Sequence, residues 1–196
     1  MDRLDSIVEF CLEIDKEKEI VRRTYLSSGN RCENDAEHAW HMAIMAILLS
    51  EYSNSRIDVL KVVTILLIHD LVEVYAGDTF AYDEEGKKTQ HQRELDAADR
   101  LFPILPPDLA SKFRSLWDEF EAGETAEAKF ARSLDNFQPT MLQAATDGRA
   151  WRECGRHLSE VLKRNECTAE GSQALWQYMR TRFIQPQLDN GHLKQD

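Results

Sequence analysis

The residues best suited to chemistry in this sequence are a histidine and an aspartate that stand next to each other in an apolar segment. His69 and Asp70 interrupt the run VVTILLIHDLVEVYAG at residues 62–77, which we predict to form one buried helix. A buried carboxylate without a partner is costly or takes up a proton. A divalent metal ion removes this conflict, because ligand bonds replace the lost hydration. Neighbouring side chains on a helix point about 100° apart and can reach one ion from adjacent sides.

Two further residues of the same kind lie in other apolar segments that we predict to be helical. Together they form a set of two imidazoles and two carboxylates that predicts a metal centre: His38, His69, Asp70 and Asp135. Such a mixed nitrogen and oxygen set suits Mn, Fe, Co, Ni or Zn, whereas Mg is a less natural partner for imidazole. An ion held by these groups keeps positions open for water or a substrate oxygen, and it acidifies the water.

Three sequence segments around these residues resemble one known family. AEHAWHMA, LLIHDLVEVYAGDT and FARSLDNFQP are similar to the HD-domain metal-dependent phosphohydrolases, in the branch of the bacterial nucleoside-monophosphate 5′-nucleotidases and their eukaryotic HD-domain relatives. The resemblance spans residues 21–147. It implies the same four metal ligands, one divalent ion and a helical HD-domain fold. Because relatives of this branch tend to be homodimers, it also implies a homodimer.

The resemblance also implies roles for residues beside the metal. Glu73 is expected to act in acid–base catalysis or to orient the attacking water, and Asp78 to lie near the substrate or the water. Arg23 precedes His38 by the spacing of an arginine that reaches the substrate in this branch. The deoxynucleotidase branch has a tryptophan after that arginine, where this chain has Thr24. A preference for deoxyribose therefore does not carry over.

The chemistry of the set favours hydrolysis of a small phosphomonoester. A metal and an arginine can neutralise a dianionic phosphate, and a carboxylate with a raised pKa can take a proton from water. Together with the resemblance, this chemistry implies a hydrolase that converts nucleoside 5′-monophosphates or similar compounds to an alcohol and phosphate. Two alternatives stay open at this point. One is a phosphodiesterase or nucleotide triphosphohydrolase, and the other is a nucleotide-binding module that holds metal without catalysis.

The elements that must position these residues are predicted to be helices. Apolar residues at intervals of three and four, together with caps at Asn34 and Asp58, predict an all-α bundle of about seven helices. The expected helices cover residues 4–20, 35–52, 59–77, 89–101, 108–123 and 125–146, with one or two more within 151–193. Pro139 should kink its helix. Residues 21–34 are expected to form a loop in which Arg22 and Arg31 make surface ion pairs.

The organisation of the chain points to one domain. We expect a single HD domain over residues 1–196, with core motifs at about 21–147 and C-terminal helices at 151–193 packing on it.

Composition narrows the classes of partner and compartment. A formal net charge of -11 disfavours binding to a nucleic acid polymer, which needs clustered basic residues. No apolar run reaches the roughly 18 residues of a membrane span. The start MDRLDSIVEF lacks the features of a signal peptide, and the 4 cysteines are scattered. These features favour a reduced, cytoplasmic environment.

Overall fold

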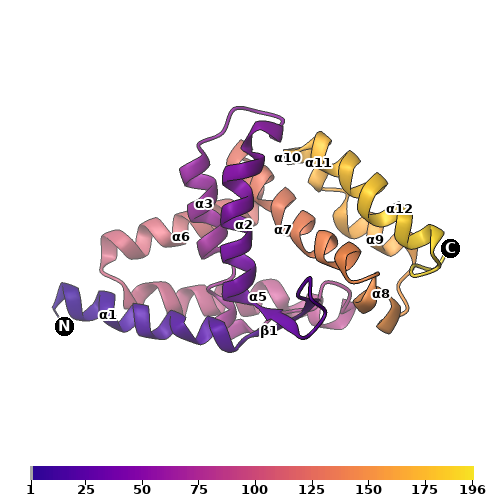
Figure 1. Ribbon diagram of the computed structural model, residues 1–196. Coiled ribbons are helices and arrows are strands. Elements are labelled where there is room, and N and C mark those ends of the chain that lie inside the picture. Colours follow the sequence, from indigo (N-terminus) through magenta and orange to yellow (C-terminus); the bar gives the residue numbers. More distant parts are fainter. Residues whose placement is uncertain (1) are drawn as a thin grey trace.

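The computed structural model describes residues 2–196, and helices make up most of it (Figure 1). The predicted all-α class is confirmed, with one small antiparallel sheet as an addition. Helix α1 (Arg3–Glu13) begins with a capping box at Asp2. It continues as the 3-10 helix η1 (Ile14–Glu19), so the helix predicted for residues 4–20 tightens over its last third.

The segment expected to be a loop contains a β-hairpin. Strand β1 (Val21–Tyr25) pairs antiparallel with β2 (Cys32–Asn34), and Val21 lies opposite Asn34. The loop prediction was therefore wrong for these strands. The alternation of inward and outward residues is too short in a strand of three residues to be visible in the sequence. The turn between the strands uses Gly29 at φ 71°, a conformation that glycine adopts at little cost.

Two antiparallel helices follow the hairpin. Helix α2 (Asp35–Leu49) starts at the predicted Asn34 cap, and the 3-10 turn η2 (Ser50–Tyr52) extends it. Helix α3 (Val59–Ile68) starts at the predicted Asp58 cap, whose side chain accepts from the backbone of Leu60 and Lys61. Figure 1 shows α2 and α3 side by side.

The helix predicted to run through residue 77 ends at Ile68 instead. The chain then makes tight turns, in which Leu71 N donates to Ile68 O and Glu73 N donates to Asp70 O. The short helix α4 (Glu73–Ala76) follows and stops at Gly77, where the sequence predicted the end. The prediction missed the break because the apolar pattern continues through it. The polar side chains of this turn, His69 and Asp70, contact partners on other elements.

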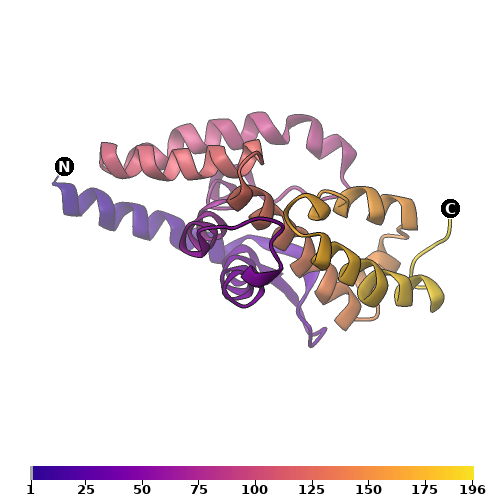
Figure 2. The same ribbon diagram turned by 90° about the horizontal axis from the view of Figure 1, so that it is seen from above.

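Three long helices occupy the middle of the chain. Helix α5 (Glu84–Leu101) starts earlier than predicted, because Asp83 caps it, and it leads through the 3-10 turn η3 (Phe102–Ile104) to α6 (Pro107–Ala122). Helix α7 (Ala126–Ala145) crosses the middle of the molecule and packs on α2, α3 and α6 (Figures 1 and 2). Pro139 lies inside α7 without ending it.

The C-terminal part is more divided than the one or two helices expected. It contains α8 (Arg149–Glu153), α9 (Leu158–Asn165), α10 (Thr168–Gly171), α11 (Gln173–Tyr178), the π-helical segment η4 (Met179–Ile184) and α12 (Gln185–Asp189). The last three follow one another without a break. Helix α10 approaches α7 so closely that a Cβ atom on Gly171 would lie 2.2 Å from Lys129 O. Only glycine fits this position.

Buried apolar side chains fall into two groups on either side of the α3 end. The larger joins α2, α3 and α7 to the C-terminal helices, and the smaller joins α1, α5 and α6. His69 to Val72 form the link between them, since Ile68, Leu71 and Val72 belong to the second group. None of the helices in residues 2–196 combines the length and apolar character needed to cross a lipid bilayer.

Candidate metal centre

Three helices bring imidazole and carboxylate groups together. His38 comes from α2, His69 from the end of α3 and Asp135 from the middle of α7, and one ligand atom of each lies within 4.8 Å of the others. Asp135 Oδ1 lies 3.1 Å from His38 Nε2 and 3.9 Å from His69 Nε2. Asp70 Oδ1 lies 3.1 Å from His69 Nε2. All four residues predicted to be metal ligands therefore converge.

Both imidazoles are held through the nitrogen that points away from this group. His38 Nδ1 donates to Gln138 Oε1 at 2.9 Å, and His69 Nδ1 donates to the backbone oxygen of Leu66 at 2.9 Å. A carbonyl oxygen only accepts, so each Nδ1 carries the proton in a neutral ring and each Nε2 carries a lone pair. Both rings are buried. The two free lone pairs therefore point toward the carboxylates.

His69 provides a test of whether a metal fits here. Its Nε2 is buried and has no hydrogen-bond partner, although two carboxylate oxygens lie within 4 Å. Burial alone would lower the pKa of His69, but the charges of Asp70 and Asp135 raise it to about 9. A lone pair facing two carboxylates requires a cation, either a proton or a metal ion. The donor set therefore fits a divalent metal.

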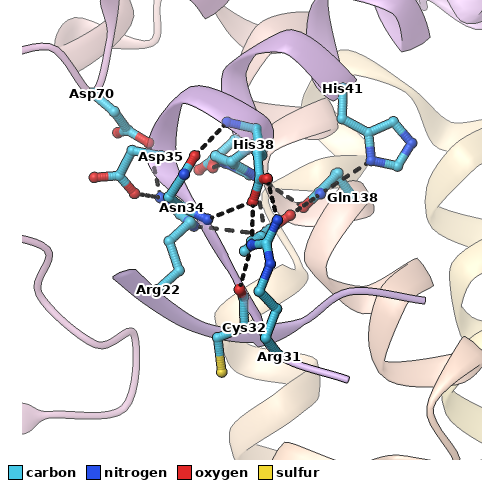
Figure 3. A network of polar contacts seen from close by, with 12 residues as sticks. Arg22, Arg31, Cys32, Asn34, Asp35, His38, His41, Asp70 and Gln138 are labelled. Carbon is cyan, nitrogen blue, oxygen red and sulfur yellow. Dashed lines mark hydrogen bonds and ion pairs between the residues drawn. The ribbon is translucent and has the colours of Figure 1, made fainter. Parts of the chain in front are cut away.

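A second group of carboxylates lies beside the first and contains an arginine. Asp35, Asp70 and Glu73 each place one oxygen within 4.8 Å of the others. Arg22 Nη1 donates to Asp35 Oδ1 at 3.0 Å and to Asp70 Oδ2 at 2.9 Å (Figure 3). The expectation that Arg22 makes a surface ion pair was wrong, because its side chain is only 14% exposed. Arg31 does pair with Glu37 at the surface.

Glu73 lies in this second group in an environment that favours its protonated form. Burial, and then the charges of Asp70 and Asp35, raise the pKa of Glu73 well above its usual value. Burial also raises the pKa of Asp35 to about 6. Glu73 Oε2 and Asp35 Oδ2 are both buried without a hydrogen-bond partner, so one shared proton would satisfy both. A carboxyl group in this state can exchange a proton near neutral pH.

A pocket of about 440 Å³ adjoins both groups and has the size of a small-molecule site. His69, Asp70 and Asp135 line it, so the predicted ligands on the ends of α3 and in α7 face the pocket. The remaining predicted site residues line it as well: Arg23, Asp78 and Glu73.

Arg23 and Asp78 differ in their surroundings. The Arg23 guanidinium lies 4.9 Å from the centre of the Phe80 ring, and within residues 2–196 no carboxylate forms an ion pair with it. Burial raises the pKa of Asp78. Thr24, where the resembling branch has tryptophan, also lines the pocket. Its smaller side chain leaves more room beside Arg23.

Three polar residues that support the site were not found from the sequence. Gln138 is fully buried and also donates through Nε2 to Glu33 Oε2 at 2.8 Å, so it links His38 to the hairpin (Figure 3). Glu33 and Asp35 are buried beside Arg22. A signal for Gln138 existed, because it stands one turn after Asp135 on an apolar helix. Nothing comparable marks Glu33 and Asp35, which look like ordinary polar residues near a cap.

Comparisons with known proteins identify the family of this chain. A sequence model of the HD domain matches residues 14–176. The human protein named 5′-deoxynucleotidase HDDC2 is 30% identical over 141 residues, which cover 71% of this chain and 67% of the human protein. The Schizosaccharomyces pombe protein named 5′-deoxynucleotidase hdd1 is 29% identical over 138 residues, covering 68% of each chain.

A solved structure provides the corresponding comparison in three dimensions. The crystal structure of a protein described as a predicted metal-dependent phosphohydrolase, from Magnetospirillum magnetotacticum, superposes with a TM-score of 0.92. It is 43% identical and is matched over 97% of this chain and 95% of its own. The similarity therefore includes the C-terminal helices as well as the central motifs.

Proposed function

This chain belongs to the HD-domain family, and we propose that it hydrolyses nucleoside 5′-monophosphates to a nucleoside and inorganic phosphate. It is a metal-dependent phosphohydrolase of the nucleotide phosphomonoesterase type. The observation that carries the assignment is the pair of buried imidazoles whose free Nε2 atoms face Asp135 at the edge of the pocket. The human and yeast relatives carry the name 5′-deoxynucleotidase, which supports a nucleotide as substrate.

We propose that one divalent ion binds to His38, His69, Asp70 and Asp135. When bound, such an ion neutralises phosphate charge and lowers the pKa of a water molecule. Two imidazole donors favour Mn, Co, Fe, Ni or Zn over Mg. The support for this proposal is the orientation of the two rings by their Nδ1 hydrogen bonds, which leaves the donor atoms aligned before any ion arrives.

The other residues of the pocket are proposed to bind substrate and to move protons. In its ionised form Glu73 takes a proton from the attacking water, and the raised pKa that burial beside Asp70 and Asp35 gives it makes this carboxylate a stronger base than an exposed one. Arg23 offers a planar guanidinium to the phosphate oxygens. Asp78 lies at the pocket wall and accepts a hydrogen bond from the water or from the sugar. Together these groups position the reactants and compensate charge, which is most of what phosphate transfer requires.

The preference for the sugar is expected to be relaxed. Thr24 stands beside Arg23 where a bulkier aromatic residue would narrow the pocket. We therefore propose that ribonucleoside and deoxyribonucleoside monophosphates are both hydrolysed.

The experiment is a measurement of phosphate release from a panel of phosphate esters. Protein stripped with chelator is reloaded separately with Mn, Co, Zn, Ni or Mg and assayed with ribo- and deoxynucleoside monophosphates. Sugar phosphates, cyclic nucleotides and nucleoside triphosphates complete the panel. Release from monophosphates that depends on metal supports the proposal. Release only from the diesters or triphosphates would contradict it, and so would metal binding without any release.

A Glu73→Gln variant tests the assigned base. The amide retains the shape of the side chain but cannot take up the proton, so turnover should fall by about 10²- to 10⁴-fold. Metal binding should persist, because Glu73 is not among the four proposed ligands. Turnover equal to that of the unchanged protein would remove Glu73 from the mechanism.

Three coarser properties are also proposed. The chain forms one HD domain over residues 1–196, with core motifs at 21–147 and the helices of 151–193 packed on them. We propose a cytoplasmic location, which the four free thiols support and cell fractionation would test.

We also propose a homodimer, which light scattering of the purified chain would test. An exposed apolar stripe on α2 supports it: Trp40, Ile44, Ile47 and Leu48.

A further inference from the structure

The C-terminal helices contribute a guanidinium to the pocket. Arg164 lies on α9, outside the segment at residues 21–147 that carries the recognisable motifs, and its side chain lines the pocket. Its Nη2 lies 3.8 Å from Asp135 Oδ2, on the carboxylate whose other oxygen faces His38 and His69. Arg164 is therefore next to the proposed metal group and exposed to whatever occupies the pocket.

The orientation of Arg164 is set by contacts between α9 and α7. Its Nη1 donates to Asn136 Oδ1, and Asn136 Nδ2 contacts Cys167 Sγ at 3.0 Å. The neighbouring Asn165 is buried and accepts from Thr140 Oγ1 at 3.3 Å. One hydrogen bond therefore anchors the guanidinium at Nη1, and the contacts of Asn136 and Asn165 fix the surface of α7 and α9 around it, so part of the conformational freedom is already lost before a ligand binds.

Most of the basic side chains that line the pocket have partners in the protein. Two buried carboxylates engage Arg22, a backbone carbonyl accepts from Arg132, and a glutamate pairs with Lys87. Arg23 and Arg164 differ from them. Arg23 stacks on an aromatic ring, and Arg164 Nη2 is too far from Asp135 for a hydrogen bond.

Donor groups therefore remain free on Arg164. A guanidinium has five N–H groups in a planar fork. Within residues 2–196, Nη1 is the atom of Arg164 that makes a hydrogen bond, and Nε and Nη2 make none. The fork that remains matches the spacing of two oxygens of a phosphate.

We propose that Arg164 binds the phosphate group of the substrate through Nε and Nη2, in addition to Arg23. This inference rests on the proposed function. A phosphate is favoured over the base or sugar as its ligand because Arg164 stands beside Asp135, where the metal group and the reacting phosphate meet. The C-terminal helices then complete the active site as well as covering the core.

Calorimetric titration of inorganic phosphate into the manganese-loaded protein tests the proposal. Arg164→Gln should weaken phosphate binding by about 10- to 100-fold, since a charge-assisted hydrogen bond is lost. Arg164→Lys keeps the charge without the fork and should fall between that variant and the unchanged protein. All of these proteins should still bind manganese to full occupancy, whereas a purely structural role would lower the metal content.

Lys163→Gln is the matched control. Lys163 is the preceding residue on α9, is exposed and does not line the pocket, so its variant loses the same charge from the same helix. It should bind phosphate as the unchanged protein does. Equal phosphate affinity for Arg164→Gln and Lys163→Gln would overturn the proposal. If Arg164→Gln does not fold, the Arg164→Lys variant decides, and phosphate affinity unchanged in that variant overturns the proposal as well.

The two proposals can fail separately. Phosphate binding that depends on Arg164, without release of phosphate from any nucleotide, would support this inference and contradict the proposed function. Hydrolysis of nucleoside monophosphates with a KM that Arg164→Gln leaves unchanged would support the function and overturn the inference.

Discussion

Two groups of buried acidic side chains lie beside each other under the pocket, and they balance their charge in different ways. Asp35, Asp70 and Glu73 surround Arg22, which donates to two of them at 3.0 and 2.9 Å. The other group, in which His38 and His69 face Asp135, contains two imidazoles, and its nearest guanidinium, that of Arg164, stays 3.8 Å from Asp135, beyond hydrogen-bond distance. The first group has a permanent cation of its own, and the second depends on one from outside.

Asp70 connects the two groups. Its Oδ2 accepts from Arg22, and its Oδ1 faces His69 Nε2 at 3.1 Å. The neighbouring carboxylates raise the pKa of Arg22 further, so the guanidinium keeps its charge at any pH at which the protein folds. Arg22 therefore fixes the direction in which Asp70 presents its second oxygen. The arrangement indicates that one cation, the Arg22 guanidinium, is permanent, whereas the other is a proton or the proposed metal ion and can exchange.

The largest effect is expected from breaking the group without its own cation. A His69→Gln variant removes one of the two donors that Nδ1 hydrogen bonds hold in place. Because the remaining groups cannot complete the site, we expect metal content to fall and metal-dependent turnover to drop by about 10³-fold or more. Elemental analysis after dialysis measures the first, and phosphate release measures the second.

A histidine that lies outside the group provides the control. His91→Gln changes an exposed side chain on α5 and should leave both metal content and turnover unchanged. Full metal content in His69→Gln would mean that the ion binds elsewhere. It would contradict the view that the group of His38, His69 and Asp135 depends on an added cation.

The next effect is expected from removing the permanent cation. Arg22→Met leaves Asp35 and Asp70 as buried charges without compensation, which costs about 3–5 kcal/mol in the free energy of unfolding. Urea denaturation at pH 7.5 measures it. The cost should shrink at pH 5, because Asp35, whose pKa burial raises to about 6, can then take up a proton.

Arg31→Met is the corresponding control at the surface of the same hairpin. Arg31 donates to Glu37 at 2.8 Å, but both side chains are largely solvated, so the expected cost is below about 1 kcal/mol. Similar losses in the two variants would show that the Arg22 contacts stabilise the fold no more than an exposed pair does.

These two arginines also show where prediction from sequence succeeds and fails. The starts of helices α2 and α3 at the caps Asn34 and Asp58 could be predicted, because cap residues and apolar spacing act locally. That His38, His69 and Asp135 approach one another could be anticipated from chemistry, since buried polar groups seek partners. Their role as metal ligands stays a prediction.

The sequence does not show which face of a short strand or turn is buried, and the features that depend on this could not be predicted. In β1, Arg22 is largely buried against carboxylates and Arg23 is exposed at the pocket, and a shift of one residue would exchange them. The sequence also hid the end of α3 at Ile68, because apolar residues continue beyond it. In the sequence, Asp35 resembles an ordinary residue of a first helical turn. Its contact with Arg22 exists only once the hairpin has folded.

Another buried carboxyl group, that of Glu17 on η1, has no hydrogen-bonded cation beside it. Its Oε1 is buried and has no hydrogen-bond partner. Burial, and then the charges of Asp70 and Asp35, raise the pKa of Glu17 to about 7. The opposing charges come from His69 and from Arg22, which already donates to two carboxylates, so the protonated form is the one that suits this position. Within one small region, the cost of burying carboxylates is therefore offset in three ways: by a proton, by a guanidinium and by the proposed metal ion.

The smallest predicted effect follows from this raised pKa. Below about pH 4.5, Glu17 is protonated in both states, and its substitution has no effect that depends on pH. Between about pH 4.5 and 7 the unfolded state ionises first, so the stability of the folded protein falls as pH rises. Glu17→Gln has no proton to lose. In chelator-treated protein it should be more stable than the unchanged chain at pH 8, by on the order of 2 kcal/mol, and nearly equal to it at pH 5.

The exposed Glu19 on the same 3-10 helix separates this effect from a general change in charge. Glu19→Gln removes the same charge and should give equal differences from the unchanged chain at both pH values. If Glu17→Gln behaved like Glu19→Gln, Glu17 would be ionised in the folded state and would need a cation near it. Arg22 and His69 are the positive groups whose charges act on Glu17, so that result would add a third carboxylate to those that these two side chains compensate.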